Sequence, residues 1–189
     1  MIKDFILASG SKQRKELLEQ LGYVPSDIIP ADIDETPNKG EKPSAYVKRM
    51  ALEKARNIAK KFPKRVVLAC DTIITAQTKI IQKAHNDAEQ EAVMRLLSGK
   101  AHKVLSAVCV IDADGKEMLR LNATRIVMKN LSEEEIRSYV DTHEWVGCCG
   151  YKIEGCMAAF VRKIIGSYSG VVGLPLYETK NLLNAAGIK

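Results

Sequence analysis

The order of its strand-like and helix-like segments constrains the fold of this 189-residue chain more than any other feature of the sequence. Apolar runs predict strands over 3–8, 65–70, 103–111, 117–128 and 156–164, and a hairpin over 72–82 that turns near Gln77-Thr78. Helical periodicity and capping residues predict helices over 11–21 and 44–62, from Asp87 to Leu97, from Ser132 to Asp141, and after Pro175. Because strands and helices mix without strict alternation, we expect an α/β fold with a mixed sheet.

Length and composition restrict the class of protein. A chain of 189 residues is expected to form a single domain over 1–189, built as one unit or as two small lobes around one core. No run approaches the roughly 20 apolar residues of a membrane span, and Lys3 and Asp4 interrupt any apolar signal region. We therefore expect a cytoplasmic protein whose five cysteines are reduced thiols. The net charge of +6 points to nucleic acid or to a small polyanionic substrate.

Lys54 breaks the apolar pattern of the predicted helix over 44–62. Residues spaced three or four apart form an apolar stripe on this helix, namely Val47, Met50, Ala51, Ala55, Ile58 and Phe62. At about 100° per residue, Lys54 falls near the middle of the stripe. Since an unpaired buried lysine is unfavourable, we interpret Lys54 as an ammonium that points into a cleft. The alternative is a lysine whose stem lies along an exposed helix end.

Asp71 and Lys83 form a second candidate pair. Asp71 directly follows the apolar run from Val66 to Cys70, and ligands of open α/β sheets bind at the carboxyl ends of strands. The alternative is an ordinary turn or cap residue. A hairpin centred on Gln77 pairs position 71 with position 83, so we expect Asp71 and Lys83 to face each other. Cross-strand pairing alone also explains such a pair.

The segment Ser9-Gly10-Ser11 separates the first predicted strand from the first predicted helix. Arg14 lies in the first turn of that helix, beside backbone N–H groups that favour a phosphate. A polyphosphate needs cations and N–H donors, and its hydrolysis needs a carboxylate that holds a divalent metal or activates water. The residues alone therefore predict a phosphate-handling protein, with further acids at Asp32, Asp34, Glu35 and Glu154.

Eight blocks of the sequence together resemble the Maf family of nucleoside triphosphate pyrophosphatases, in its order and spacing. These blocks are LASGSKQRKELLEQLG, ADIDETP, ALEKA, ACDTII, RLLSGKAH, LSEEEIRSYV, CCGYKIEG and GSYSGVVGLPLYET. The resemblance implies an elongated mixed sheet flanked by helices, with two lobes around a central cleft, in a Maf/ITPase-like fold that is often dimeric. It also implies hydrolysis of a nucleoside triphosphate at the α-phosphorus, assisted by a divalent metal cation, Mg²⁺ or Mn²⁺. The family's proposed role is nucleotide house-cleaning, and members have been linked to cell-division arrest.

The resemblance also assigns roles to individual residues. Asp71 matches the proton acceptor, and Lys54 and Lys83 match the phosphate-facing lysines. Glu35 matches an acid of the cleft, and with Asp71 and Glu154 it is a candidate metal ligand. The expected substrate-binding residues are Ser9, Gly10, Ser11, Gln13, Arg14, Thr72 and Glu154. Three of these, Gln13, Thr72 and Glu154, match positions associated with base selection.

The chain departs from the family's pattern at three places. The usual S-P-R-R is here Ser11-Lys12-Gln13-Arg14, the usual G-K-P is Gln82-Lys83-Ala84, and the glutamine of I-Q-G is Glu154. Glu154 is shared with the subgroup that resembles 7-methyl-GTP pyrophosphatases, whereas Thr72 is shared with the subgroup acting on dTTP and UTP. The base preference therefore stays open, and an inactive homologue is one alternative.

A second alternative is a non-enzymatic protein that binds nucleic acid or a partner in division control. The charge of +6 motivates it. Aromatic residues make up only 5% of the chain, and none interleave with a basic run, which disfavours a stacking platform for single strands. The basic residues are dispersed and no helix-turn-helix or zinc module is recognisable, so binding of nucleic acid is disfavoured.

Overall fold

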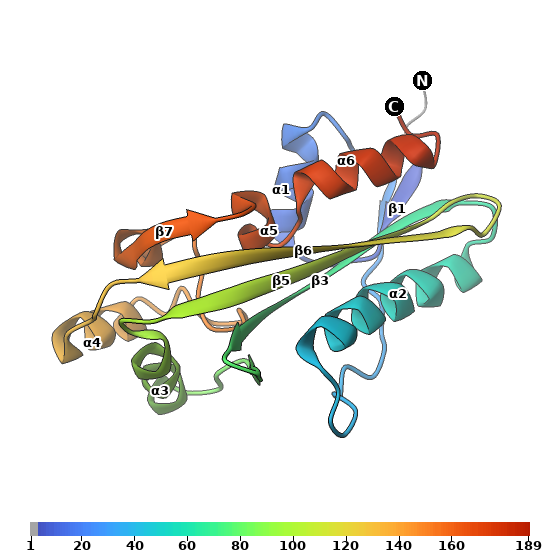
Figure 1. Cartoon of the computed structure of the whole chain (residues 1–189). Helices are drawn as coiled ribbons and strands as arrows, with labels where there is room; N and C mark the ends of the chain where they lie inside the picture. The colour runs from blue at the N-terminus through green and yellow to red at the C-terminus, as the bar shows by residue number, and fades with distance from the viewer. Residues whose placement is uncertain (1–3) are drawn as a thin grey trace.

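A single mixed sheet organises residues 4–189, the part of the chain that the computed structural model describes (Figure 1). Its seven strands are β1 (Phe5–Leu7), β2 (Asp27–Ile28), β3 (Val66–Ala76), β4 (Lys79–Ile81), β5 (Ala101–Ile111), β6 (Glu117–Met128) and β7 (Val161–Ile165). The strand order is β2-β1-β3-β5-β6-β7, with β4 beside β3. β1 is parallel to β2 and β3, and the other pairs are antiparallel. The predicted α/β fold with a mixed sheet is confirmed.

Helices cover both faces of this sheet. They are α1 (Lys12–Gln20), α2 (Pro43–Lys61), α3 (Asp87–Leu97), α4 (Glu133–Asp141), the 3₁₀ helix η1 (Cys156–Phe160), α5 (Tyr168–Val172) and α6 (Leu176–Ala185). α2 lies on one face, and α1, α5 and α6 lie on the other (Figure 1). α3 and α4 lie at one end of the sheet (Figure 1), where they pack in a separate core with Trp145 and Tyr151. Within residues 4–189, no helix has both the length and the apolar character needed to cross a membrane.

The side-chain alternation of β3 determines which face each site residue occupies. Successive residues of a strand point to opposite faces of the sheet. Val67, Ala69 and Ile73 belong to the core beneath α2, whereas Val66, Leu68 and Cys70 belong to the core beneath α1 and α6. Asp71 therefore lies on the α2 face, and Thr72 lies on the opposite face.

One edge of β3 is open between its two short neighbours. β1 pairs with β3 only at residues 66–68, and β4 pairs with it only at residues 74–76. Among the described residues, residues 69–73 have a strand partner, β5, on the other edge alone. The chain leaves β1 at this gap and enters α1 through Ser9-Gly10-Ser11. The gap is therefore the point at which a ligand can approach the sheet.

The structure corrects the predicted environment of Asp71. The strand predicted over 65–70 does not end there, since β3 continues to Ala76 and pairs Asp71 with Ala107 of β5. The predicted turn at Gln77-Thr78 is confirmed, because Ala76 pairs with Lys79. The pairing of Asp71 with Lys83 is wrong, since the register is shifted by one residue and the β3–β4 ladder ends at Ile74 and Ile81.

Two other predicted segments differ from the structure, and part of a third is not described. The strand predicted over 156–164 is a 3₁₀ helix up to Phe160 and a strand only from Val161. The segment GSYSGVVGLP, predicted as a glycine-rich loop, contains α5, because the Ser167 side chain accepts a hydrogen bond from Gly170 N and caps the helix. Residue 3, the first of the strand predicted over 3–8, lies outside the described residues.

Candidate active site

A cleft of about 490 Å³ opens beside the gap in the edge of β3. Most of the predicted site residues line it, namely Ser11, Gln13, Arg14, Glu35, Lys54, Asp71, Thr72, Lys83 and Glu154. They come from α1, the segment before α2, α2 itself, β3, and the segments that follow β4 and α4. Of the predicted set, Ser9 and Gly10 do not line the cleft. Ser9 is buried behind it and contacts Arg14.

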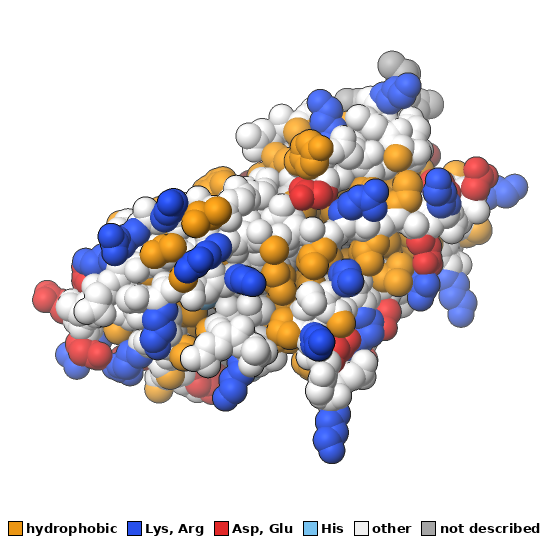
Figure 2. Space-filling view, viewed as in Figure 1, with side chains coloured by type: hydrophobic (Ala, Val, Ile, Leu, Met, Phe, Trp, Pro, Cys, Tyr) orange, Lys and Arg blue, Asp and Glu red, His pale blue; other side chains and the backbone are white. Residues whose placement is uncertain are grey.

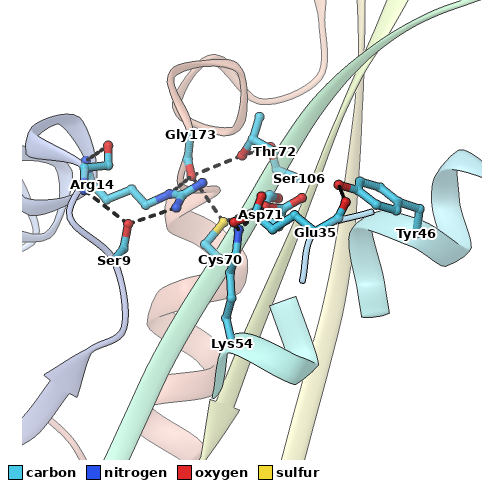
Figure 3. Close-up of polar contacts among 11 residues, drawn as sticks. Ser9, Arg14, Glu35, Tyr46, Lys54, Cys70, Asp71, Thr72, Ser106 and Gly173 are labelled. Atoms are coloured by element: carbon cyan, nitrogen blue, oxygen red, sulfur yellow. Dashed lines mark hydrogen bonds and ion pairs between the residues drawn. The ribbon is translucent and has the colours of Figure 1, made fainter. Parts of the chain in front are cut away.

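Lys54 and Asp71 form a buried ion pair at the floor of the cleft. Lys54 is 9% exposed and Asp71 is 7% exposed, and Lys54 Nζ lies 2.7 Å from Asp71 Oδ1. The same ammonium lies 3.0 Å from Oε1 of Glu35, whose side chain is 52% exposed (Figure 3). The lysine thus points into the cleft, and the alternative of an exposed lysine at a helix end does not hold. Because Asp71 is on the α2 face of β3, the lysine of α2 reaches it directly.

Arg14 is held at the N-terminal end of α1. Its guanidinium donates from Nη1 to Ser9 Oγ at 2.9 Å and from Nε to Gly173 O at 2.9 Å (Figure 3). Ser11 caps the helix by accepting from Arg14 N, and its own N–H donates to Ser9 Oγ at 3.3 Å. A guanidinium has five N–H donors, so Arg14 keeps donors for an anion in the cleft.

The carbonyl oxygen of Gly173 joins the two sides of the cleft. It accepts from Arg14 Nε, from Cys70 Sγ at 3.2 Å and from Thr72 Oγ1 at 3.3 Å (Figure 3). Gly173 ends α5 with a φ of +135°, a conformation that other residues rarely adopt. Thr72 Oγ1 also lies 3.0 Å from Ser106 Oγ, which donates to Gly170 O. α5 is thereby tied to β3 and β5 through side-chain hydroxyls.

Several residues of the cleft were not identified from the sequence. The sequence indicates only that Gly173 belongs to a glycine-rich segment. The feature that could have identified it is the block GSYSGVVGLPLYET, which contains it. Tyr46 donates from its hydroxyl to Glu35 O at 2.8 Å and so fixes the segment that carries Glu35. Tyr46, Cys148, Cys149, Tyr151 and Lys152 also line the cleft, without any pattern that marked them beforehand.

Burial and the nearby carboxylates shape the electrostatics of the cleft. Burial, with the charges of Asp71 and Glu35 added, raises the pKa of Tyr46 to about 12, so this phenol remains a hydrogen-bond donor. Burial also raises the pKa of Cys149, although the nearby ammonium of Lys83 acts in the opposite direction. Lys83 itself is exposed at the rim of the cleft, and Glu154 is exposed there too.

The acids of the cleft fit a metal that is held jointly with a substrate. Glu35 and Asp71 both approach one point, the ammonium of Lys54. Mg²⁺ is usually bound through one or two carboxylates, waters and substrate phosphates, not by an all-protein cage. Within residues 4–189, no three His, Cys, Asp or Glu side chains are grouped as a ready metal site. The assignment of Glu35, Asp71 and Glu154 as ligands stays a prediction.

The basic side chains do not form one patch on the visible face of the molecule. Figure 2 shows Lys and Arg side chains scattered over that face, with acidic side chains among them. On this face, the basic residues that contribute to the net charge of +6 are therefore dispersed. In the cleft, by contrast, Arg14, Lys54 and Lys83 line the same cavity as the buried carboxylate of Asp71.

The mixed sheet and this cleft define an α/β protein that presents cations and a carboxylate to an anionic ligand. The chain belongs to the Maf-like protein family, whose model matches residues 4–186. It is 48% identical over 187 residues to a dTTP/UTP pyrophosphatase from Roseobacter denitrificans, and the match covers 98% of each chain. It is 43% identical over 188 residues to a dTTP/UTP pyrophosphatase from Zymomonas mobilis, covering 99% of this chain and 93% of the relative.

The fold is also similar to a solved structure of low sequence identity. A HAM1 protein from Coxiella burnetii superposes with a TM-score of 0.53 at 17% identity, covering 97% of this chain and 99% of that chain. At this identity the similarity concerns the fold. It agrees with the expected elongated mixed sheet flanked by helices.

Proposed function

We propose that this protein hydrolyses nucleoside triphosphates, deoxy or ribo, to nucleoside monophosphates and pyrophosphate. The observation that carries the proposal is the buried pair of Lys54 and Asp71 beside the Arg14 guanidinium in one cleft. The names of the relatives, dTTP/UTP pyrophosphatases at 41–48% identity, support the same reaction. The biological role that fits is removal of surplus or modified nucleotides in the cytoplasm, by a chain that acts as a homodimer.

The cations of the cleft neutralise the triphosphate. Arg14 and Lys83 bind phosphate oxygens, and Lys54 shares its ammonium between a phosphate oxygen and Asp71. Negative charge moves to the leaving pyrophosphate in the transition state, and fixed cations stabilise that charge. Asp71 accepts the proton of the attacking water. The water oxygen bonds to the α-phosphorus while the bond from phosphorus to the pyrophosphate oxygen breaks.

A divalent metal belongs to this proposal as a partner of the substrate. Glu35 and Asp71 would hold it together with phosphate oxygens, and Glu154 is the third candidate ligand. When bound, Mg²⁺ or Mn²⁺ supplies positive charge to the triphosphate and polarises a phosphoryl oxygen. Lys54 then has a further role in this chain, because its ammonium balances the two carboxylates before the metal and the substrate arrive.

Base selection is assigned to three polar residues that line the cleft, Gln13, Thr72 and Glu154. Gln13 offers both a donor and an acceptor, whereas an ionised Glu154 only accepts. Thr72 is fixed by Gly173 and Ser106. The test must therefore cover bases with different hydrogen-bonding edges. dTTP, UTP, GTP and 7-methyl-GTP meet that need.

The experiment is an assay of pyrophosphate release by the purified protein with Mg²⁺ or Mn²⁺ and this nucleotide panel. We expect release from at least one nucleotide, and a loss of about 10²-fold or more in Asp71→Asn, the scale of a lost general base. Asp114→Asn is the matched control, since Asp114 lies in the exposed turn between β5 and β6. A wild-type protein that releases no pyrophosphate from any nucleotide contradicts the activity, and a fully active Asp71→Asn contradicts the role of Asp71.

A further inference from the structure

One wall of the cleft is a segment without helix or strand. We call residues 147–154 the cleft wall, because all of them except Gly150 line the cleft. The segment consists of turns and bends between α4 and η1. It belongs to no strand ladder and has few backbone hydrogen bonds of its own, so side-chain contacts add to what holds it. The contacts that hold the cleft wall therefore decide where its side chains lie.

Three buried side chains from three different elements hold the cleft wall. Gln90 of α3 is 1% exposed and donates from Nε2 to Gly150 O at 2.6 Å. His102 of β5 is 4% exposed, and its Nε2 lies 2.7 Å from Tyr151 Oη. Tyr139 of α4 is 1% exposed, and its hydroxyl accepts from the N–H of Lys152 at 3.3 Å. Three consecutive residues of the wall are thus each held from behind.

Gly150 brings the wall into contact with the strand that carries the proposed base. Its φ is +81°, and a Cβ at this position would lie 2.9 Å from Ile74 Cδ1 of β3. A side chain here would be strained by the positive φ and would also require Ile74 Cδ1 to move. Ile74 is three residues beyond Asp71 in β3. The hydrogen bond from Gln90 therefore fixes the wall at the point where it touches the strand of Asp71.

The wall lies in a cleft that also has an apolar lining, which suits the nucleoside part of a nucleotide. Among the residues that line the cleft, Ile74, Ile81, Val104, Tyr151 and Ile153 belong to the apolar core of the lobe that contains α3 and α4. Arg14, Lys54 and Asp71, the charged groups that the proposed function assigns to the triphosphate, come from other elements. Pockets for organic ligands combine an apolar lining with a few fixed polar groups. Here the polar groups of the wall are at Lys152 and Glu154.

We propose that Gln90 and His102 are positioning residues that set the base selectivity of the cleft by holding the cleft wall. Neither side chain lines the cleft, so neither contacts the nucleotide directly. The proposal rests on the proposed function of this cleft as a nucleotide site. It concerns the nucleoside part, because the cations assigned to the triphosphate, Arg14, Lys54 and Lys83, belong to other elements.

The test uses near-isosteric variants that remove one hydrogen bond each. Gln90→Met removes the donor to Gly150 O, and Tyr151→Phe removes the hydroxyl that meets His102 while the ring stays. We measure kcat and KM for the nucleotide panel, and the inhibition constant of tripolyphosphate, which has no base. Losing one buried hydrogen bond corresponds to roughly a threefold to tenfold change. We expect KM for the preferred nucleotide to rise, and the ratio of kcat/KM between preferred and poorest nucleotides to fall, by that factor. The tripolyphosphate constant should stay within about twofold.

A control variant separates positioning from general loss of stability. Leu183→Ala opens a cavity in the core beneath α6, which contains no residue of the cleft wall. It should lower the melting temperature and leave the selectivity ratio unchanged. If Gln90→Met and Tyr151→Phe keep the wild-type ratio, or if tripolyphosphate binding weakens as much as nucleotide binding, the positioning role is wrong.

The same comparison by calorimetry separates this inference from the proposed activity. Dissociation constants for the panel are measured in an Asp71→Asn background, where no turnover is expected, with and without Gln90→Met. A fall in base discrimination on adding Gln90→Met supports the positioning role even if the wild-type protein releases no pyrophosphate. If Asp71→Asn and Asp71→Asn/Gln90→Met discriminate equally between the bases, the positioning role is wrong, whatever the activity of the wild type.

Discussion

Replacing Lys54 by methionine separates the two consequences of the buried ion pair. The side chain of Lys54 is 11% exposed and that of Asp71 is 9% exposed, so solvent screens their interaction only weakly. Lys54→Met keeps the length and the apolar stem of the side chain but removes the ammonium that lies 2.7 Å from Asp71. The Asp71 carboxylate is then buried without this cation.

The expected magnitude follows from the cost of breaking such a pair. Removing one partner of a buried ion pair typically costs about 3–5 kcal/mol, because the other charge stays desolvated. For a chain of this size, that corresponds to a fall in melting temperature of roughly 6–20 °C. The double variant Lys54→Met/Asp71→Asn removes both charges, so most of the lost stability should return. Activity should not return, because a cation and the proton acceptor are both absent.

Urea denaturation followed by circular dichroism gives the stabilities, and pyrophosphate release gives the activities. Arg95→Met is the matched control. Arg95 pairs with Glu133 at 2.7 Å, but their side chains are 43% and 58% exposed, and we expect a change below about 1 kcal/mol. A Lys54→Met protein within 1 kcal/mol of the wild type, or a double variant no more stable than the single one, would refute this account of the pair.

Three further predictions follow from individual groups. Burial lowers the pKa of His102 from 6.5 to about 4, so between these pH values the unfolded state binds a proton that the folded state does not. The free energy of unfolding should therefore decrease by about 3 kcal/mol from pH 7 to pH 4 through this group, and His102→Phe should lose that part of the slope in urea denaturation. Because burial raises the pKa of Cys149, iodoacetamide should label it more slowly than exposed Cys156 at pH 7, and faster as the pH rises. Bound nucleotide should protect Cys149 but not Cys156 in peptide mass spectrometry, and equal labelling with and without nucleotide would contradict its place in the cleft. Gly173→Ala should destabilise the fold by about 1–3 kcal/mol in the same denaturation assay, because alanine is strained at a φ of +135°. It should also reduce pyrophosphate release by moving the carbonyl that holds Arg14, and an alanine variant with wild-type stability and activity would contradict that role.

The parts of the fold and the site that were predictable depend on local patterns. The apolar stripe around Lys54 is a property of one helix, and it correctly placed the lysine in the cleft. The turn at Gln77-Thr78 is equally local and was also predicted. The extension of β3 beyond Cys70 was missed because Asp71 interrupts an apolar run. That residue is tolerated in the strand because Lys54 pairs with it from another element.

The remaining parts of the site depend on contacts between distant segments. The Gly173 carbonyl accepts hydrogen bonds from residues more than 100 positions away. The cleft wall is held by Gln90 and His102, which lie 60 and 49 positions from their partners. No periodicity or capping rule brings such residues together, because their meeting depends on the order of strands in the sheet. The sequence likewise did not predict that Lys54 forms ion pairs with both Glu35 and Asp71.

Hydrolysis in water enriched in ¹⁸O, followed by ³¹P NMR, tests the central claim most directly. The claim is that water attacks the α-phosphorus of a nucleoside triphosphate beside Asp71. It predicts that the products are a nucleoside monophosphate and pyrophosphate, with the ¹⁸O in the phosphate of the monophosphate and none in the pyrophosphate. Formation of a nucleoside diphosphate and labelled inorganic phosphate, or ¹⁸O in the pyrophosphate, would contradict it.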